Sequence, residues 1–171
     1  RADPDMRRVM ADAHLPYCVM HWQTDTFGDA AGASYSDSDI IGKVVGDLQV
    51  LVERALAVGV EERNIVLDPG LGFAKTRNQD WELLRGLPYF VNSGFPVLVG
   101  ASRKRFLGEL LAHADPRYTP ATPPEPVERD LATAVVSAIC GYNGVWCVRV
   151  HDVPSTVPVS YTHLTLPTTP Y

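Results

Sequence analysis

Residues 64–76, NIVLDPGLGFAKT, decide the fold of this chain. An apolar run at 65–67 leads into a carboxylate, Asp68, which is followed at once by Pro69. Because proline has no backbone N–H and cannot continue a sheet ladder, the pattern predicts a buried strand that ends at Asp68. Glycines at 70 and 72 can adopt positive φ, so the next loop can fold tightly and admit a flat ligand close to its backbone. The stretch predicts either a binding carboxylate at a strand end or an Asp that only organises its own turn.

Three further apolar runs, at residues 17–20, 95–100 and 145–150, have the same short, continuous character, which is typical of a parallel sheet covered on both faces. Apolar residues at helical spacing predict helices over 1–14, 39–58, 79–87, 102–111 and 126–141. The alternation predicts an α/β fold, either an open doubly wound sheet or part of a TIM (β/α)8 barrel. Because a complete barrel takes about 250 residues, 171 residues with roomy loops correspond to about half of one.

The composition is that of a soluble globular protein, with 46% hydrophobic and 20% charged residues. The net charge of −5 argues against a general nucleic-acid binder, and no apolar run approaches the ~20 residues needed to cross a bilayer. The three cysteines, Cys18, Cys140 and Cys147, are odd in number and form no C-x-x-C pair. We therefore expect buried free thiols and a location in the reducing cytoplasm.

Residues 158–171 differ in character from the rest of the chain. They are rich in Thr and Pro, carry no formal charge and show neither helical nor strand periodicity. We expect residues 1–157 to form the folded domain and residues 158–171 to be an irregular, poorly packed tail. The tail also resembles translated read-through of a sequencing adapter, and we expect it to be foreign to the protein.

Each of the four apolar runs ends in a polar cluster. His21 and Trp22 follow the first run, Asp68 ends the second, residues 100–104 end the third and residues 149–152 end the fourth. In parallel α/β architectures, ligands bind at the carboxyl ends of the strands. Polar clusters at all of these strand ends therefore predict a functional site there.

The last cluster contains an arginine and a histidine two residues apart. On an extended strand, Arg149 and His151 project to the same face. A guanidinium beside an imidazole suits a phosphate or a diphosphate. The alternative is that Arg149 pairs with a nearby acid and His151 caps the strand end.

Basic residues at 103–105 gather at the predicted start of the helix over 102–111, where cations oppose the helix dipole. A bound anion or the carboxylate of Asp68 would offset Lys104, whereas the two neighbouring arginines fit a solvated basic run. Ser102 is well placed as the N-cap of this helix. No spacing resembles a zinc site and no phosphate-binding glycine motif occurs, so no metal site is predicted in this chain.

Four motifs, one at each strand end, together resemble dihydropteroate synthase, a folate-pathway enzyme family with a TIM-barrel fold, and most closely its actinobacterial members. The motifs are VMHW at 19–22, LDPGLGFAKT at 67–76, VLVGASRKRFLG at 97–108 and VRVHDV at 148–153. The resemblance runs from Arg1 to about Val157. It implies that the chain is the C-terminal half of the barrel, with parallel strands five to eight and their helices.

In that family, the amino group of 4-aminobenzoate attacks the exocyclic methylene of a dihydropterin-methyl diphosphate, and diphosphate leaves. The resemblance implies that Asp68 and Lys104 are catalytic and bind the pterin, Asp68 through two acceptors that match the amide and amino edge of the pterin. The other implied roles are pterin contacts for Met20 and Gly100, aminobenzoate contacts for Phe73 and Ser102, and diphosphate contacts for Arg149 and His151. The implied partners are these two substrates and sulfonamide-type analogues, without nucleic acid or membrane; a homodimer is left open.

In family members, the first four strands carry the Asn that binds Mg²⁺ with the diphosphate, further pterin-binding residues and two mobile loops. None of these lies in this chain, so we expect negligible turnover from it alone, and Mg²⁺ as a cofactor of the full-length family only. Three alternatives stay open. They are the pterin-binding barrel of a methyltetrahydrofolate-dependent methyltransferase, which needs no diphosphate clamp, a non-catalytic synthase paralogue, and another phosphate-handling barrel in which Asp68 contacts a sugar.

Overall fold

Four short parallel strands form the centre of the molecule. The computed structural model describes residues 5–22, 39–119 and 121–164. The strands are β1 (Tyr17–Met20), β2 (Ile65–Asp68), β3 (Leu98–Val99) and β4 (Cys147–Val148). β1 pairs with β2 and β3 pairs with β4, both in parallel, and a parallel bridge between Leu67 and Val97 joins the two pairs. The predicted α/β class with parallel strands is confirmed.

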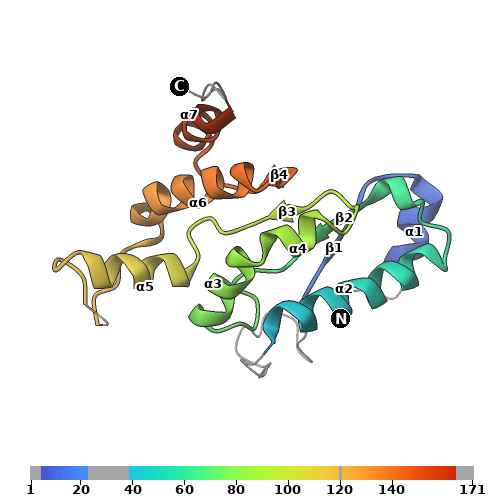
Figure 1. Ribbon diagram of the computed structural model, residues 1–171, viewed down its shortest axis with the longest axis horizontal. Coiled ribbons are helices and arrows are strands. Elements are labelled where there is room, and N and C mark those ends of the chain that lie inside the picture. The colour runs from blue at the N-terminus through green and yellow to red at the C-terminus, as the bar shows by residue number, and fades with distance from the viewer. Residues whose placement is uncertain (1–4, 23–38, 120, 165–171) are drawn as a thin grey trace, which may run out of the picture.

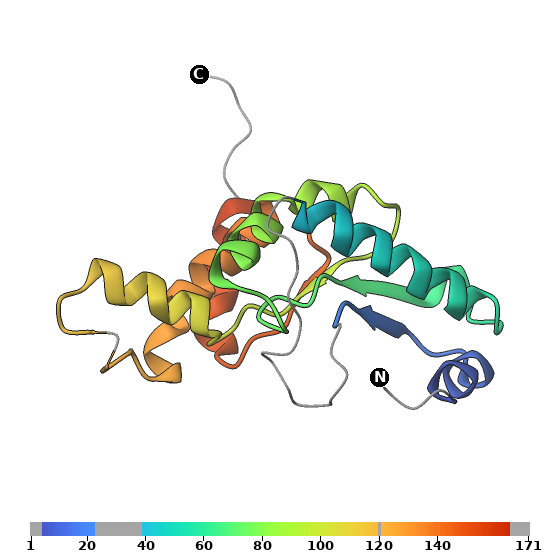
Figure 2. The same ribbon diagram turned by 90° about the horizontal axis from the view of Figure 1, so that it is seen from below.

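Helices connect the strands (Figure 1). They are α1 (Met6–Ala13), α2 (Ile40–Leu56), α3 (Arg77–Arg85), α4 (Leu87–Val91), α5 (Arg105–Ala114), α6 (Asp130–Tyr142) and α7 (Val153–Leu164), with 3-10 turns η1 (Glu62–Asn64) and η2 (Pro126–Arg129). Figures 1 and 2 show α2, α3 and α4 along one side of the strands, and α5, α6 and α7 gathered at the end of the molecule opposite α1. The helices thus lie on the sheet much as a β/α alternation predicts.

Local sequence explains where the longest helix begins. Asp39 is the N-cap of α2, and its side chain accepts a hydrogen bond of 2.8 Å from the Gly42 N–H. A side-chain oxygen at this position satisfies one of the free N–H groups of the first turn. One face of α2 is buried at three- and four-residue spacings, by Ile40, Val44, Leu48, Val52 and Ala55. This face packs into the core with β2 and α4, as the apolar periodicity predicts.

The helix that the spacing predicts over 79–87 is two helices. Thr76 caps α3 through a capping box with Gln79, so the helix begins at Arg77, earlier than predicted. It ends at Gly86, and α4 follows with Pro88 in its first turn. Proline is well tolerated there because the N–H groups of the first turn have no partner within the helix. The strand predicted over 95–100 is likewise shorter, with only Leu98–Val99 in β3.

One face of the strands is less covered than the parallel-sheet pattern predicts. Val19 is buried, whereas its neighbour Cys18 on the opposite face of β1 is exposed. Cys147 on β4 is half-buried, and only Cys140 on α6 is fully buried. All of these thiols are free, as expected, but the expectation that all are buried is wrong. The described helices cover the α2 side of β1 and leave Cys18 on the other side in contact with solvent.

The last strand is followed by a helix that the sequence pattern does not predict. α7 runs from Val153 to Leu164 and includes Pro158, so residues 158–164 are helical rather than irregular. Asp152 accepts a hydrogen bond from the Ser155 N–H at the start of this helix. α7 also packs on α6, and this tertiary contact compensates for the missing N–H of Pro158.

Two predicted segments lie outside the described residues: the loop at 23–37 and the end of the tail at 165–171. Within the described ranges, every helix is too short or too polar to cross a membrane.

Candidate functional site

The carboxyl ends of the strands lie at one rim of the molecule. Met20 and Asp68 are register partners at the ends of β1 and β2. The charges of Asp68 and Arg149 both act on the Lys104 ammonium, which follows β3 in the chain. Arg149 follows β4 and donates its backbone N–H to the Val99 carbonyl at 3.0 Å. The acid, the ammonium and the guanidinium that the sequence predicts at one rim are therefore neighbours.

Asp68 is a buried carboxylate with one oxygen held in place. Its side chain is 8% exposed, and Oδ1 accepts a hydrogen bond of 2.8 Å from the Gly70 N–H. Burial raises the pKa of this carboxyl, and the Gly70 N–H, Lys104 and Lys75 act in the opposite direction. No described residue donates a hydrogen bond to Oδ2 of Asp68, so this oxygen can accept one from a ligand.

Lys104 reaches across to the loop that follows Asp68. Its Nζ donates a hydrogen bond to the Leu71 carbonyl and lies 4.4 Å from the centroid of the Phe73 ring. Trp22 also contacts this ring, at a centroid separation of 5.3 Å. Burial lowers the pKa of Lys104, as does Arg149, whereas Asp68 and Asp80 raise it. The site thus contains an ammonium that is held against an aromatic face and has lost part of its water shell.

Two glycines bring the backbone of this loop close to its neighbours. Gly70 and Gly72 have φ of 69° and 71°, in the left-handed region. A Cβ at Gly70 would overlap the His21 carbonyl oxygen, and a Cβ at Gly72 would lie 2.7 Å from Cδ of Lys104. Only glycine satisfies both the conformation and the lack of space. The predicted tight loop is confirmed, whereas the space beside both glycines is filled by the His21 carbonyl and the Lys104 stem.

The loop is held from beneath by Lys75, a residue that the motif contains but to which no role is assigned from the sequence. Its Nζ donates to the carbonyl oxygens of Gly70 at 2.8 Å and Phe73 at 3.1 Å, and lies 3.1 Å from Nδ1 of His21. Burial lowers the pKa of Lys75 to about 8. Lys75 therefore satisfies the Phe73 carbonyl and gives the Gly70 carbonyl a second donor besides the Phe73 N–H.

His21 extends this network toward α2. Its ring is 1% exposed, and Nε2 lies 3.0 Å from Oδ2 of Asp47. Oδ1 of Asp47 accepts a hydrogen bond of 2.6 Å from Lys43. Burial, and secondly the charge of Lys75, lowers the pKa of His21 to about 4. An imidazole that stays neutral here can accept from the Lys75 ammonium through Nδ1 and donate to Asp47 through Nε2.

Asp80 is a second residue of the site region without a role assigned from the sequence. Its Oδ1 accepts a hydrogen bond of 2.7 Å from the Gly72 N–H, and burial raises its pKa to about 6. The sequence does indicate that Asp80 is buried, because it lies at helical spacing from the apolar residues Leu83, Leu84 and Leu87. An acid on the buried face of a helix normally has a partner inside the protein.

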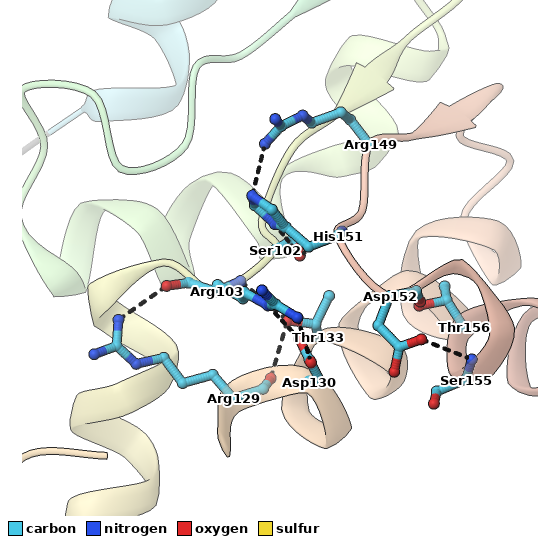
Figure 3. A network of polar contacts seen from close by, with 10 residues as sticks. All are labelled: Ser102, Arg103, Arg129, Asp130, Thr133, Arg149, His151, Asp152, Ser155 and Thr156. Carbon is cyan, nitrogen blue, oxygen red and sulfur yellow. Dashed lines mark hydrogen bonds and ion pairs between the residues drawn. The ribbon is translucent and has the colours of Figure 1, made fainter. Parts of the chain in front are cut away.

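Arg149 and His151, the predicted pair after β4, lie next to each other, and His151 also bonds Ser102 (Figure 3). Nη1 of Arg149 lies 3.4 Å from Nε2 of His151, while Nδ1 of His151 lies 2.9 Å from Oγ of Ser102. Ser102 Oγ also accepts the His151 backbone N–H at 3.1 Å. The interpretation of Ser102 as the N-cap of the following helix is wrong. Lys104 occupies that position, and the Ser102 side chain instead bonds a residue 49 positions away.

Arg103 is not part of a solvated basic run. Its guanidinium forms an ion pair of 2.8 Å with Asp130, whereas Arg105 is exposed.

A cavity of about 490 Å³ lies between the starts of α3 and α5, beside Gly72, Lys104 and Phe106. It can admit a small aromatic molecule next to the Phe73 loop. The described residues contain no cluster of three or more His, Cys, Asp or Glu side chains that could hold a metal ion.

The sequence profile of the family described as "Pterin binding enzyme" matches residues 1–151. The chain belongs to this family. A dihydropteroate synthase from Mycobacterium leprae is 45% identical over 157 residues, which cover 92% of this chain and 53% of that protein. The resemblance drawn from the four motifs is therefore confirmed, and this pterin binding enzyme has relatives named dihydropteroate synthase.

Solved structures agree with this family. A Yersinia pestis dihydropteroate synthase in complex with a sulfonamide drug superposes with a TM-score of 0.82 and 29% identity, over 94% of this chain and 54% of that one. The Xanthomonas albilineans enzyme with 4-aminobenzoic acid gives a TM-score of 0.80 and 28% identity, over 99% and 58%. This pterin binding enzyme chain spans about half the length of the relatives that it matches.

Proposed function

We propose that the complete protein is a dihydropteroate synthase, and that this chain supplies strands five to eight of its TIM barrel. The observation that carries the proposal is that the Lys104 ammonium interacts electrostatically with both Asp68 and Arg149, while Arg149 also lies 3.4 Å from His151. The relatives' names and the half-length match support it. The exposed face of β1 around Cys18 also supports it, because strands one to four of a closed barrel would cover that face.

The pterin is held by Asp68 and Lys104. Oδ2 of Asp68 accepts a hydrogen bond from the pterin's amide and amino edge, while the Gly70 N–H fixes the carboxylate through Oδ1. Met20, opposite Asp68 in the register, and Gly100, just after β3, form the walls of the slot. The Lys104 ammonium lies beside the pterin, on the side that faces the second substrate.

4-Aminobenzoate lies between the Phe73 loop and the start of α5. The Phe73 ring, beneath the Lys104 ammonium, offers it an apolar surface, and Ser102 precedes Lys104 by two residues in the turn before α5. The cavity between α3 and α5 gives it space. Sulfonamide-type analogues, which share the aromatic amine, would bind in the same place.

The reaction is a displacement at the exocyclic methylene of the dihydropterin-methyl diphosphate. The amine nitrogen forms a bond to the methylene carbon, the carbon–oxygen bond breaks with its electron pair on the departing diphosphate, and the amine loses a proton. Arg149 and His151 hold the diphosphate, so that fixed donors meet the charge as it develops. The methyltransferase alternative has no use for such a pair.

The described residues do not fit a magnesium site. Arg149 is a cation at the diphosphate end and faces Nε2 of His151, and the described residues contain no group of three or more His, Cys, Asp or Glu side chains that could hold a metal ion. We therefore assign no step to Mg²⁺ in this half of the barrel, and any ligand that holds it would come from the other half.

The proposal also extends to a homodimer. α6 exposes a row of apolar side chains at helical spacing, of which Leu131 is 76% and Tyr142 is 82% exposed, with Val135 and Ile139 between them. Apolar rows of this kind commonly mark protein interfaces. Light scattering on the complete protein tests this, because Val135→Asp would then shift a dimer to monomers.

The synthase proposal is tested by assaying the complete gene product with both substrates and Mg²⁺, and by calorimetric titration with pteroic acid. Asp68→Asn replaces an acceptor of the pterin edge by a donor, so affinity falls by at least about tenfold. Asp115→Asn, on the exposed loop after α5, is the matched control and leaves binding unchanged. Pteroic acid that binds equally to the Asp68 variant would contradict the assignment. Binding without turnover in the wild type would identify a non-catalytic paralogue instead.

A further inference from the structure

The turn that carries Ser102 and Lys104 contains an unfavourable backbone conformation. The Lys104 N–H donates to the Ala101 carbonyl at 3.2 Å and closes the turn, with Arg103 at φ 59°. Residues with a Cβ adopt this left-handed region rarely, and glycine is usual at this position of such turns. Arg103 therefore needs interactions elsewhere that hold it in this conformation.

Those interactions come from η2 and the first turn of α6 (Figure 3). The Arg103 N–H donates to Oγ1 of Thr133 at 3.1 Å, and its guanidinium donates to both oxygens of Asp130 at 2.8 Å through Nε and Nη2. The Arg103 carbonyl accepts from Nη1 of Arg129 at 2.9 Å. The N–H, the carbonyl and the side chain of Arg103 are thus all bound by one short segment of the chain. We call Arg129, Asp130 and Thr133 the α6 clamp.

The α6 clamp is itself fixed. Oγ1 of Thr133 donates to the Arg129 carbonyl at 2.9 Å. Arg129 also donates to the Pro124 carbonyl through Nη2 at 2.7 Å and packs against Gly108 on α5, where a Cβ would lie 2.8 Å from its Nε. The clamp therefore ties the turn to α5, to α6 and to the loop between them.

The residues on either side of Arg103 both reach the rim. Ser102 bonds His151 at 2.9 Å, and Lys104 lies over the Phe73 ring. A relaxed Arg103 would rotate the peptide planes on both sides and move these two side chains together. We infer that Arg103 is a positioning residue for the proposed synthase reaction, held left-handed by the α6 clamp so that Ser102 and Lys104 meet their partners. This inference rests on the proposed function for its catalytic readout.

The first experiment compares kinetics in the complete gene product. Asp130→Asn removes the charge of the ion pair, and Thr133→Val removes the acceptor of the Arg103 N–H. Each is expected to lower kcat/KM for 4-aminobenzoate by about tenfold, through a lower kcat and a higher KM. The reason is that misplaced groups in the site slow the reaction. Asp115→Asn, which breaks the exposed Arg117–Asp115 pair, is the matched control and stays within about twofold of wild type.

A double-mutant cycle separates positioning from simple stabilisation. Arg103→Gly tolerates the left-handed conformation but cannot bond Asp130, so adding Asp130→Asn to it should change kcat/KM by less than about twofold. If Asp130→Asn costs the same tenfold in the Arg103→Gly background, or costs nothing in the wild type, the inference is overturned.

A second readout uses this chain and no substrate. The ring signals of His151 in a ¹H–¹³C NMR spectrum report its contact with Ser102, and Thr133→Val, which removes the acceptor of the Arg103 N–H without changing a charge, should shift them while the exposed His113 stays unchanged. Unmoved His151 signals would overturn the inference. Because this measurement needs no turnover, an inactive wild-type protein would refute the proposed function without deciding the role of Arg103.

Discussion

The ammonium of Lys104 lies 4.4 Å from the centre of the Phe73 ring, so a cation from the start of α5 covers an aromatic face from the loop after β2. The two residues are far apart in the chain and come from different strand ends. Burial and Arg149 lower the pKa of Lys104, while the carboxylates of Asp68 and Asp80 raise it. The ring and the two acids thus favour the charged form of this side chain, against the effect of burial.

This contact leads to the first prediction. Phe73→Leu keeps an apolar side chain but removes the aromatic face, which is worth about 1 kcal/mol to a nearby cation. We expect the KM for 4-aminobenzoate in the complete protein to rise by about fivefold. Phe73→Tyr keeps the ring and is the control, with a KM close to that of the wild type. A Leu variant with the wild-type KM would show that the ring contributes only bulk.

The second prediction concerns Lys75. Lys75→Met keeps the stem of the side chain but removes the donor of the Phe73 carbonyl oxygen and one of the two donors of the Gly70 carbonyl oxygen. Because an unsatisfied buried polar group costs about 1–3 kcal/mol, the free energy of unfolding in urea should fall by about 2 kcal/mol, and pteroic acid should bind more weakly. Arg85→Met removes an exposed cation from α3 and is expected to leave both measurements unchanged.

The pH dependence of Lys75 gives a second check on that variant. Its pKa is about 8 in the folded protein and 10.5 in the unfolded chain. Between these values the unfolded state binds more protons, so the wild type gains stability as the pH rises from 8 to 10.5. The Met variant lacks this gain. Parallel stability curves for the two proteins across that range would contradict the assignment.

The third prediction concerns His21 at acid pH. Its pKa is about 4 in the folded protein, against 6.5 unfolded, so the unfolded state binds more protons between these values. The wild type therefore loses stability as the pH falls from 6.5 to 4, by about 3 kcal/mol at most. Asp80 acts in the opposite direction, because its folded pKa of about 6 lies above 3.8. His21→Gln removes only the first effect.

We expect His21→Gln to lose about 2 kcal/mol less stability than the wild type when urea unfolding is compared at pH 7 and pH 4.5. Gln can still bond Asp47, so the variant keeps a partner for that carboxylate. Equal losses in both proteins would mean that the buried ring is not the group that titrates.

A fourth prediction addresses Arg149. Arg149→Lys keeps the charge near Lys104 and His151 but loses the planar fork that binds two phosphate oxygens. Inhibition by added diphosphate, measured with the complete enzyme, should weaken by about tenfold. Arg117→Lys, at an exposed pair far along the chain, is the control. An unchanged inhibition constant in the Arg149 variant would remove it from the diphosphate site.

The strand ends could be predicted from the sequence because their signals are local. Pro69 stops β2 just after Asp68, and the glycines that follow allow the tight loop that the structure contains. The proximity of Arg149 to His151 was predicted from an extended strand, but β4 ends at Val148 and both residues lie beyond it, where Ser102 holds His151. What is local in the chain was therefore accessible from residue types.

What the sequence could not supply depends on partners far away. Ser102 has the residue type and place of an N-cap, yet its bond goes to His151 because the ends of β3 and β4 lie side by side. The residue type of Lys75 shows only that a cation lies close to Asp68 in the chain; its bonds to the loop carbonyls depend on how the loop folds. Likewise α7 forms on α6 despite Pro158, because tertiary contact outweighs helix propensity.

The absence of side-chain space at Gly70 and Gly72 limits how this protein can be re-engineered. An added methyl group would overlap the His21 carbonyl at the first position and displace the stem of Lys104 at the second. In a mutant library designed to accept new aromatic amines, substitutions at these two glycines would disrupt the loop. Diversity belongs at Phe73 and Arg105, where a new side chain can alter the shape of the cavity without moving the backbone that holds Asp68.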